Sequence, residues 1–104
     1  MAKLENDKHQ QTYPNLRKIR RACNKELYRT IKRLHIWVPP GRMAEAEKLY
    51  LDKVVAHLPF IVEHSSNRKV LADWWEENVC PDIAAIWNVD REHLARAFRD
   101  AFGG

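Results

Sequence analysis

The chain has 104 residues, of which 45% are hydrophobic and four are tryptophan, and its formal net charge is +4. This length and composition predict one domain with its own hydrophobic core and exclude a disordered chain. No apolar run approaches the roughly 18 residues of a membrane span, and the polar first residues do not resemble a secretory leader. With only three glycines and few alternating runs, the expected fold class is all-α, a small bundle of four to five helices.

Charge divides the chain into two unlike parts. Residues 14–37 hold eight lysines or arginines against one carboxylate, Glu26. Residues 73–104 hold seven carboxylates against three arginines. The two cysteines, Cys23 and Cys80, are far apart in a chain with no secretory feature, so we expect reduced thiols in a cytoplasmic protein.

Residues 1–13 are polar and aperiodic, which predicts a disordered arm before a single helical domain over 14–104. The first helix is predicted from Asn15 to about Trp37. Its apolar face repeats at steps of three and four and comprises Leu16, Ile19, Cys23, Leu27, Ile31 and Leu34. The opposite face carries cations at the same steps, namely Lys18, Arg21, Lys25, Arg29 and Lys32.

This basic stripe predicts a surface that follows the phosphates of nucleic acid or binds another polyanion. Two alternatives are a solvated face and a face packed against the acidic C-terminal third or a protein partner. Tyr28 lies beside the stripe, where it is suited to stack on a base or to cover the rim of the core.

Prolines divide the middle of the chain. A second helix is predicted from near Arg42 to about Leu58, after Val38-Pro39-Pro40-Gly41 ends the first. Residues 60–62 are predicted to form a last helical turn or a buried crossing segment. A third helix follows the capping cluster at 65–67 and runs to about Val79, and at least one tryptophan of its Trp74–Trp75 pair is expected inside, with the other at the core edge or on a partner.

The last quarter of the chain predicts two short helices joined by a tight turn, a helix-turn-helix over 82–102. Ala84 permits close approach of the two helices, and Asn88 suits a positive φ four positions later. Asp90 is expected to cap the next helix, whose apolar stripe contains Leu94 and Phe98. Val89 and Ala97 are also expected to face inward, and Arg91, Glu92, Ala95, Arg96 and Arg99 outward.

The motif reads Ile83-Ala84-x-x-x-Asn88-Val89-Asp90-x-x-x-Leu94-x-Arg96-x-Phe98-Arg99-x-x-Phe102-Gly103. It resembles a helix-turn-helix of the AraC-type transcription regulators, which usually carry Gly and Ser where Asn88 and Asp90 stand. The resemblance covers about residues 82–103, and no second copy of the motif occurs. It implies a DNA-binding regulator that acts as a dimer and whose last helix enters the major groove, with Arg91 and Arg96 contacting guanine and Arg99 contacting phosphate.

Enzyme signatures are absent from the sequence, which has no glycine-rich phosphate loop, HExxH or CxxC pattern,. We therefore expect no catalytic residues, metal or cofactor, and no membrane partner. The favoured interpretation is a small nucleic-acid-binding protein, a DNA-binding transcriptional regulator that uses the C-terminal helix and the basic first helix. RNA binding through the first helix is a variant of it. The alternative is a protein-interaction module or inhibitor in which the helix-turn-helix is only packing.

Overall fold

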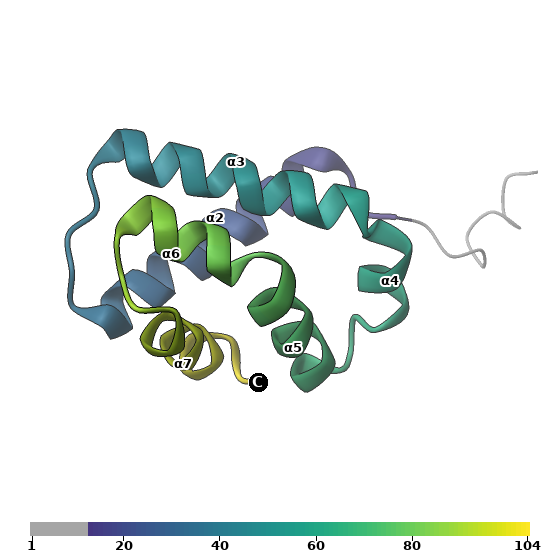
Figure 1. Ribbon diagram of the computed structural model, residues 1–104. Helices are drawn as coiled ribbons and strands as arrows, with labels where there is room; N and C mark the ends of the chain where they lie inside the picture. The colour runs from purple at the N-terminus through teal and green to yellow at the C-terminus, as the bar shows by residue number, and fades with distance from the viewer. Residues whose placement is uncertain (1–12) are drawn as a thin grey trace, which may run out of the picture.

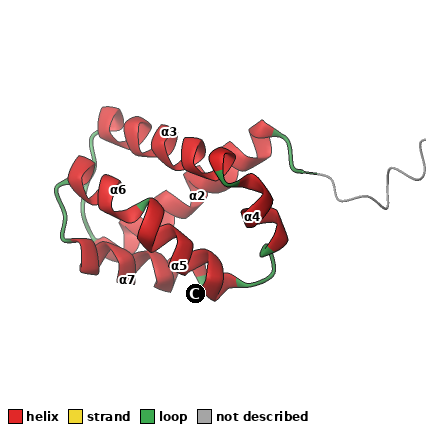
Figure 2. Cartoon of the chain, turned by 45° about the vertical axis from the view of Figure 1, so that its right-hand side comes forward, coloured by secondary structure: helices red, strands yellow, loops and turns green. Residues whose placement is uncertain are grey.

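Six α-helices follow one another in the part of the chain that the structure, a computed structural model, describes, residues 13–104 (Figure 1). They are α2 (Leu16–Leu34), α3 (Pro40–Ala56), α4 (Leu58–Glu63), α5 (Arg68–Asn78), α6 (Cys80–Trp87) and α7 (Arg91–Phe102). No strand occurs within these residues, so the all-α prediction is confirmed (Figure 2). The helix number exceeds the predicted four to five because residues 58–63 form a helix of their own. Apart from Tyr13, the predicted arm lies outside the described residues.

Helix α2 is bounded by two local features. The Asn15 side chain accepts a hydrogen bond from the Lys18 amide at 2.9 Å and caps the first turn. At the other end His35 adopts a left-handed conformation with φ 57°, and its amide donates to the Ile31 carbonyl. The helix therefore ends at Leu34, three residues before the predicted Trp37.

The prolines act at helix starts. Pro40 opens α3 two residues before the predicted start, since a proline in the first turn loses no intrahelical hydrogen bond,. Pro59 similarly occupies the first turn of α4. None of the residues of α4 is buried, which rules out a buried crossing segment at residues 60–62. Asn67 caps α5 by accepting from the Val70 amide, as the capping cluster predicted.

Aromatic rings form the centre of the core. The rings of Trp75 and Phe98 stack with centroids 3.8 Å apart, and Tyr50 meets both edge-on. Trp74 and Trp75 are both buried, with 8% and 1% of their surfaces exposed. Neither tryptophan of the pair is therefore left to meet a partner.

Helices α2 and α6 lie between α3 on one side and α7 on the other (Figures 1 and 2). The apolar side of α2 packs against α7 and α3, so its opposite side faces away from the molecule. None of the described helices is long and apolar enough to cross a membrane.

Candidate nucleic-acid interface

The outward face of α2 carries a continuous row of cations, which we call the basic stripe: Lys18, Arg21, Lys25, Arg29 and Lys32. All five residues are exposed, whereas Ile19, Cys23 and Leu27 on the opposite face are buried. Among residues 13–104, no carboxylate lies within 4.0 Å of any of the five cationic groups. The stripe is thus a row of exposed positive charge about 21 Å long, given a helical rise of 1.5 Å per residue.

Two carboxylates lie near the stripe, Glu26 on α2 itself and Glu47, which lines a shallow hollow with Arg21. Glu26 points inward from α2 and is partly buried. Glu47 of α3 accepts a hydrogen bond from the Asn24 side chain. The stripe is also not packed against the acidic C-terminal third, because α2 contacts α7 through its apolar side. The alternative in which the stripe packs against the acidic C-terminal third is therefore wrong.

Two exposed aromatic side chains lie on α2 and in the loop that follows it. Tyr28 lies on α2 with 52% of its surface exposed, and Trp37 lies in the α2–α3 loop with 78% exposed. The other three tryptophans are buried. Trp37 was predicted to end the first helix and was not identified as an exposed surface residue. The run Val38-Pro39-Pro40 directly after Trp37 could have indicated that Trp37 lies outside the helix, because a helix rarely continues into consecutive prolines.

The corner between α6 and α7 has the predicted geometry. Asn88 adopts φ 56° and ψ 52°, a left-handed conformation, and its amide donates to the Ala84 carbonyl. The Val89 amide donates to the same carbonyl at 3.0 Å. Asp90 caps α7 by accepting from the His93 amide at 2.9 Å. The predicted helix–turn–helix path of the chain is therefore present.

The outward face of α7 has mixed charge. Leu94, Ala97 and Phe98 are buried as predicted, but Ala95 is buried too, although the prediction placed it outward. The exposed residues of α7 are Arg91, Glu92, His93, Arg96 and Asp100. Two arginines and two carboxylates therefore share the face that would approach a duplex.

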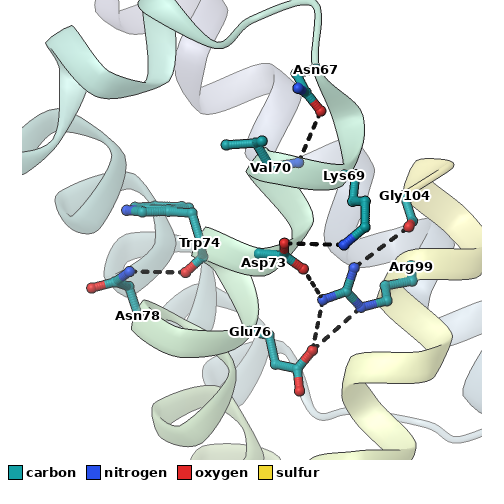
Figure 3. A network of polar contacts seen from close by, with 9 residues as sticks. All are labelled: Asn67, Lys69, Val70, Asp73, Trp74, Glu76, Asn78, Arg99 and Gly104. Atoms are coloured by element: carbon teal, nitrogen blue, oxygen red, sulfur yellow. Dashed lines mark hydrogen bonds and ion pairs between the residues drawn. The ribbon is translucent and has the colours of Figure 1, made fainter.

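Arg99 is engaged by carboxylates of the same chain at the surface (Figure 3). Its guanidinium lies 2.6 Å from an Asp73 carboxylate oxygen and 2.9 Å from a Glu76 carboxylate oxygen, both on α5. These hydrogen bonds lower the pKa of Asp73 and raise that of Arg99. The arginine ties α7 to α5, which corrects its predicted role as a free phosphate contact. Arg91 and Arg96 are exposed and form no ion pair with any residue in the described range.

The α2–α3 loop and the α6–α7 corner lie at the same end of the molecule (Figures 1 and 2). The Trp87 indole N–H donates to the Arg42 carbonyl at 3.3 Å and ties α6 to the start of α3. Trp37 and Asn88 line one shallow hollow of about 300 Å³ there. Segments about fifty residues apart in sequence are thereby brought together.

Other chemistries find little support among the described residues. Burial raises the pKa of the Cys23 thiol to about 12 and that of Cys80 to about 11, so neither is a ready nucleophile,. No group of three His, Cys, Asp or Glu side chains within residues 13–104 is placed to hold a metal ion. The His57 and His64 rings instead bond to carbonyls of the preceding turn.

Comparison of the chain with protein-family models, with curated proteins and with solved structures found no match.

Proposed function

We propose that this protein binds nucleic acid, with the basic stripe of α2 as its main contact surface. The observation that carries the proposal is the row of five exposed cations without a carboxylate within 4.0 Å in the described residues. Like charges at helical steps of three and four repel one another. Phosphates placed along the row relieve this repulsion, and the release of their counterions drives binding.

The role of a DNA-binding transcriptional regulator is the more specific form of this proposal. It is supported by the left-handed corner at Asn88, by the Asp90 cap and by the resemblance to AraC-type regulators. In this form, Arg91 and Arg96 contact bases while the stripe contacts phosphates, and two copies of the chain act together. The carboxylates beside Arg96 weaken the field of α7, so the stripe supplies most of the affinity.

The test is a binding titration with labelled DNA and RNA, both single-stranded and duplex, at several salt concentrations. Five phosphate contacts predict that log K falls with log salt at a slope of about −4.5 for duplex DNA and about −3.5 for single strands. Lys25→Glu with Arg29→Glu should lower the affinity about tenfold or more and flatten the slope, because two contacts become repulsive.

A matched control is Lys53→Glu with Lys69→Glu, which makes the same change in net charge on α3 and α5. Both lysines pair only with nearby carboxylates of the chain, Asp82 and Asp73. The control should bind as the unmodified protein does. If both double variants lose affinity equally, the net charge matters rather than the stripe, and the proposed surface is wrong.

A protein-interaction module is the second candidate, favoured by the exposure of Trp37. Tryptophan is enriched among the residues that anchor protein interfaces. The same titration separates the two functions, since an interaction module gives no salt-dependent binding to any of the nucleic acids.

A further inference from the structure

We infer that the preferred ligand is a single-stranded nucleic acid whose unpaired bases stack on Tyr28 and Trp37. This inference rests on the nucleic-acid binding proposed above, and it names an unpaired strand in place of the duplex that the regulator form would bind. Proteins that bind single strands without reading sequence combine a cationic track for the backbone with aromatic side chains for the bases. The structure places both along α2 and the loop that follows it.

Tyr28 stands within the basic stripe. The order along this side of α2 is Arg21, Lys25, Tyr28 and Lys32, at steps of four, three and four residues, so the four side chains share one face. The ring is 52% exposed, and its hydroxyl has no hydrogen-bond partner within residues 13–104. A strand whose phosphates follow the lysines therefore passes directly over this ring.

Trp37 provides the second aromatic surface. It is the most exposed of the large hydrophobic side chains in the described residues, at 78%. Only four residues separate it from Lys32, so it lies within reach of a strand that runs off the end of the stripe. Its loop is held at both sides, by the end of α2 and by the bond from Trp87 to the Arg42 carbonyl. The indole is thus presented from a fixed segment.

Stacking distinguishes single strands from duplexes. In a duplex the base faces are already stacked on one another, and only the base edges are accessible from the grooves. An exposed indole gains little from such a ligand, whereas every unpaired base offers a planar face to it. The helix suited to a groove, α7, presents two carboxylates around Arg96. The charge of α2 together with its two rings therefore favours the unpaired strand.

The experiment uses the fluorescence of the full chain. Because the other three tryptophans are buried, an aqueous quencher such as acrylamide reports mainly on Trp37. Oligo(dT) and oligo(rU) of about twelve nucleotides should protect Trp37 from acrylamide, and a duplex of equal length should protect it much less. Comparison of the two oligonucleotides shows whether the 2′-hydroxyl matters.

Variants then separate stacking from charge. Trp37→Ala should lower the affinity for oligo(dT) by about 5- to 150-fold, the loss expected for one stacked base. It should leave the salt slope and the duplex affinity unchanged, because it removes no charge. Trp37→Phe, which keeps an aromatic face, should retain most of the affinity, and Tyr28→Ala should also weaken oligo(dT) binding by about fivefold or more.

The control is Phe60→Ala, which removes an exposed aromatic side chain from α4, at the end of the molecule away from Trp37 (Figure 1). It should bind oligo(dT) unchanged. Circular dichroism checks that every variant is folded. Trp37→Ala should fold normally because Trp37 is exposed.

If Trp37→Ala binds oligo(dT) as tightly as the unmodified protein, or if the duplex binds more tightly than the single strand, the stacking inference is overturned while nucleic-acid binding stands. If neither form of nucleic acid binds, the proposed function itself fails.

Discussion

Glu26 is a residue whose environment opposes its charge. It is the sole carboxylate in the sequence of α2, and it lines an apolar cavity of about 400 Å³ with Tyr50 and Trp74. Its Oε1 atom is shielded from solvent and has no hydrogen-bond partner among the described residues. Burial raises the pKa of Glu26, and this effect outweighs the opposite influence of Arg29, Arg68 and Lys25.

Glu26→Gln should therefore stabilise the protein at neutral pH. A raised folded-state pKa means that the folded protein binds the proton more tightly, so its stability falls as the pH rises from the usual value of 4.5 through the folded pKa,. The variant does not ionise, and we expect a gain of about 1 kcal/mol in the free energy of unfolding near neutral pH.

Urea denaturation in neutral and acidic buffer measures this difference. The gain should shrink as the pH is lowered below 4.5, where the glutamate is protonated in both states,. A loss of stability at neutral pH would instead mean that the three neighbouring cations stabilise an ionised Glu26.

At the scale of the elements, two helices end in a left-handed residue that is not glycine. His35 follows α2 and Asn88 follows α6. Each amide bonds back to a carbonyl of the last helical turn, which ends the helix and redirects the chain,. The position of Trp37 and the path into α7 both depend on these single conformations.

Substitutions at Asn88 should separate the backbone conformation from the side chain. Asn88→Ala should lower the free energy of unfolding by about 1 kcal/mol, because alanine is less tolerant of the left-handed region. Asn88→Gly should leave it unchanged or raise it, since glycine adopts positive φ without strain. Thermal or urea unfolding measures both. Equal losses for the two variants would show that the amide side chain, and not the conformation, holds the corner.

At the scale of the whole molecule, charge is separated between two faces. The basic stripe faces outward from α2, whereas the acidic side chains of α5 and α7 gather around Arg99 and the α7 surface. An acidic ligand is attracted to one side of such a molecule and repelled by the other. Binding through α2 and binding through α7 are therefore distinct orientations of the same protein.

A pair of single substitutions decides between these orientations. Arg21→Ala and Arg96→Ala each remove one exposed arginine, from α2 and α7 respectively, and change the net charge equally. Arg21→Ala should weaken nucleic-acid binding and reduce the magnitude of the salt slope by about 0.7 to 0.9. Arg96→Ala should leave the affinity for single-stranded oligo(dT) within about twofold, because the base contacts proposed for Arg96 are made only in a duplex groove. The reverse result would identify α7 as the binding helix and α2 as a solvated face.

The sequence by itself determined the features that depend on near neighbours. Spacings of three and four residues fix which side of a helix is apolar, so the burial of Leu27 and the exposure of Lys25 followed from the pattern. The side chains of Asn67 and Asp90 each accept a hydrogen bond from the amide three residues later. The Asn88 amide donates to the carbonyl four residues earlier. The all-α class and the corner before α7 were predictable for this reason.

Only the tertiary structure decided which distant side chains meet. Arg99 pairs with Asp73 across 26 residues, and the Trp87 indole bonds to the Arg42 carbonyl across 45. The burial of Ala95 and the placement of Trp37 beside the corner also depend on such contacts. Helical periodicity specifies the direction of a side chain from its own axis but not the helix that it faces, so these relations required the packed molecule.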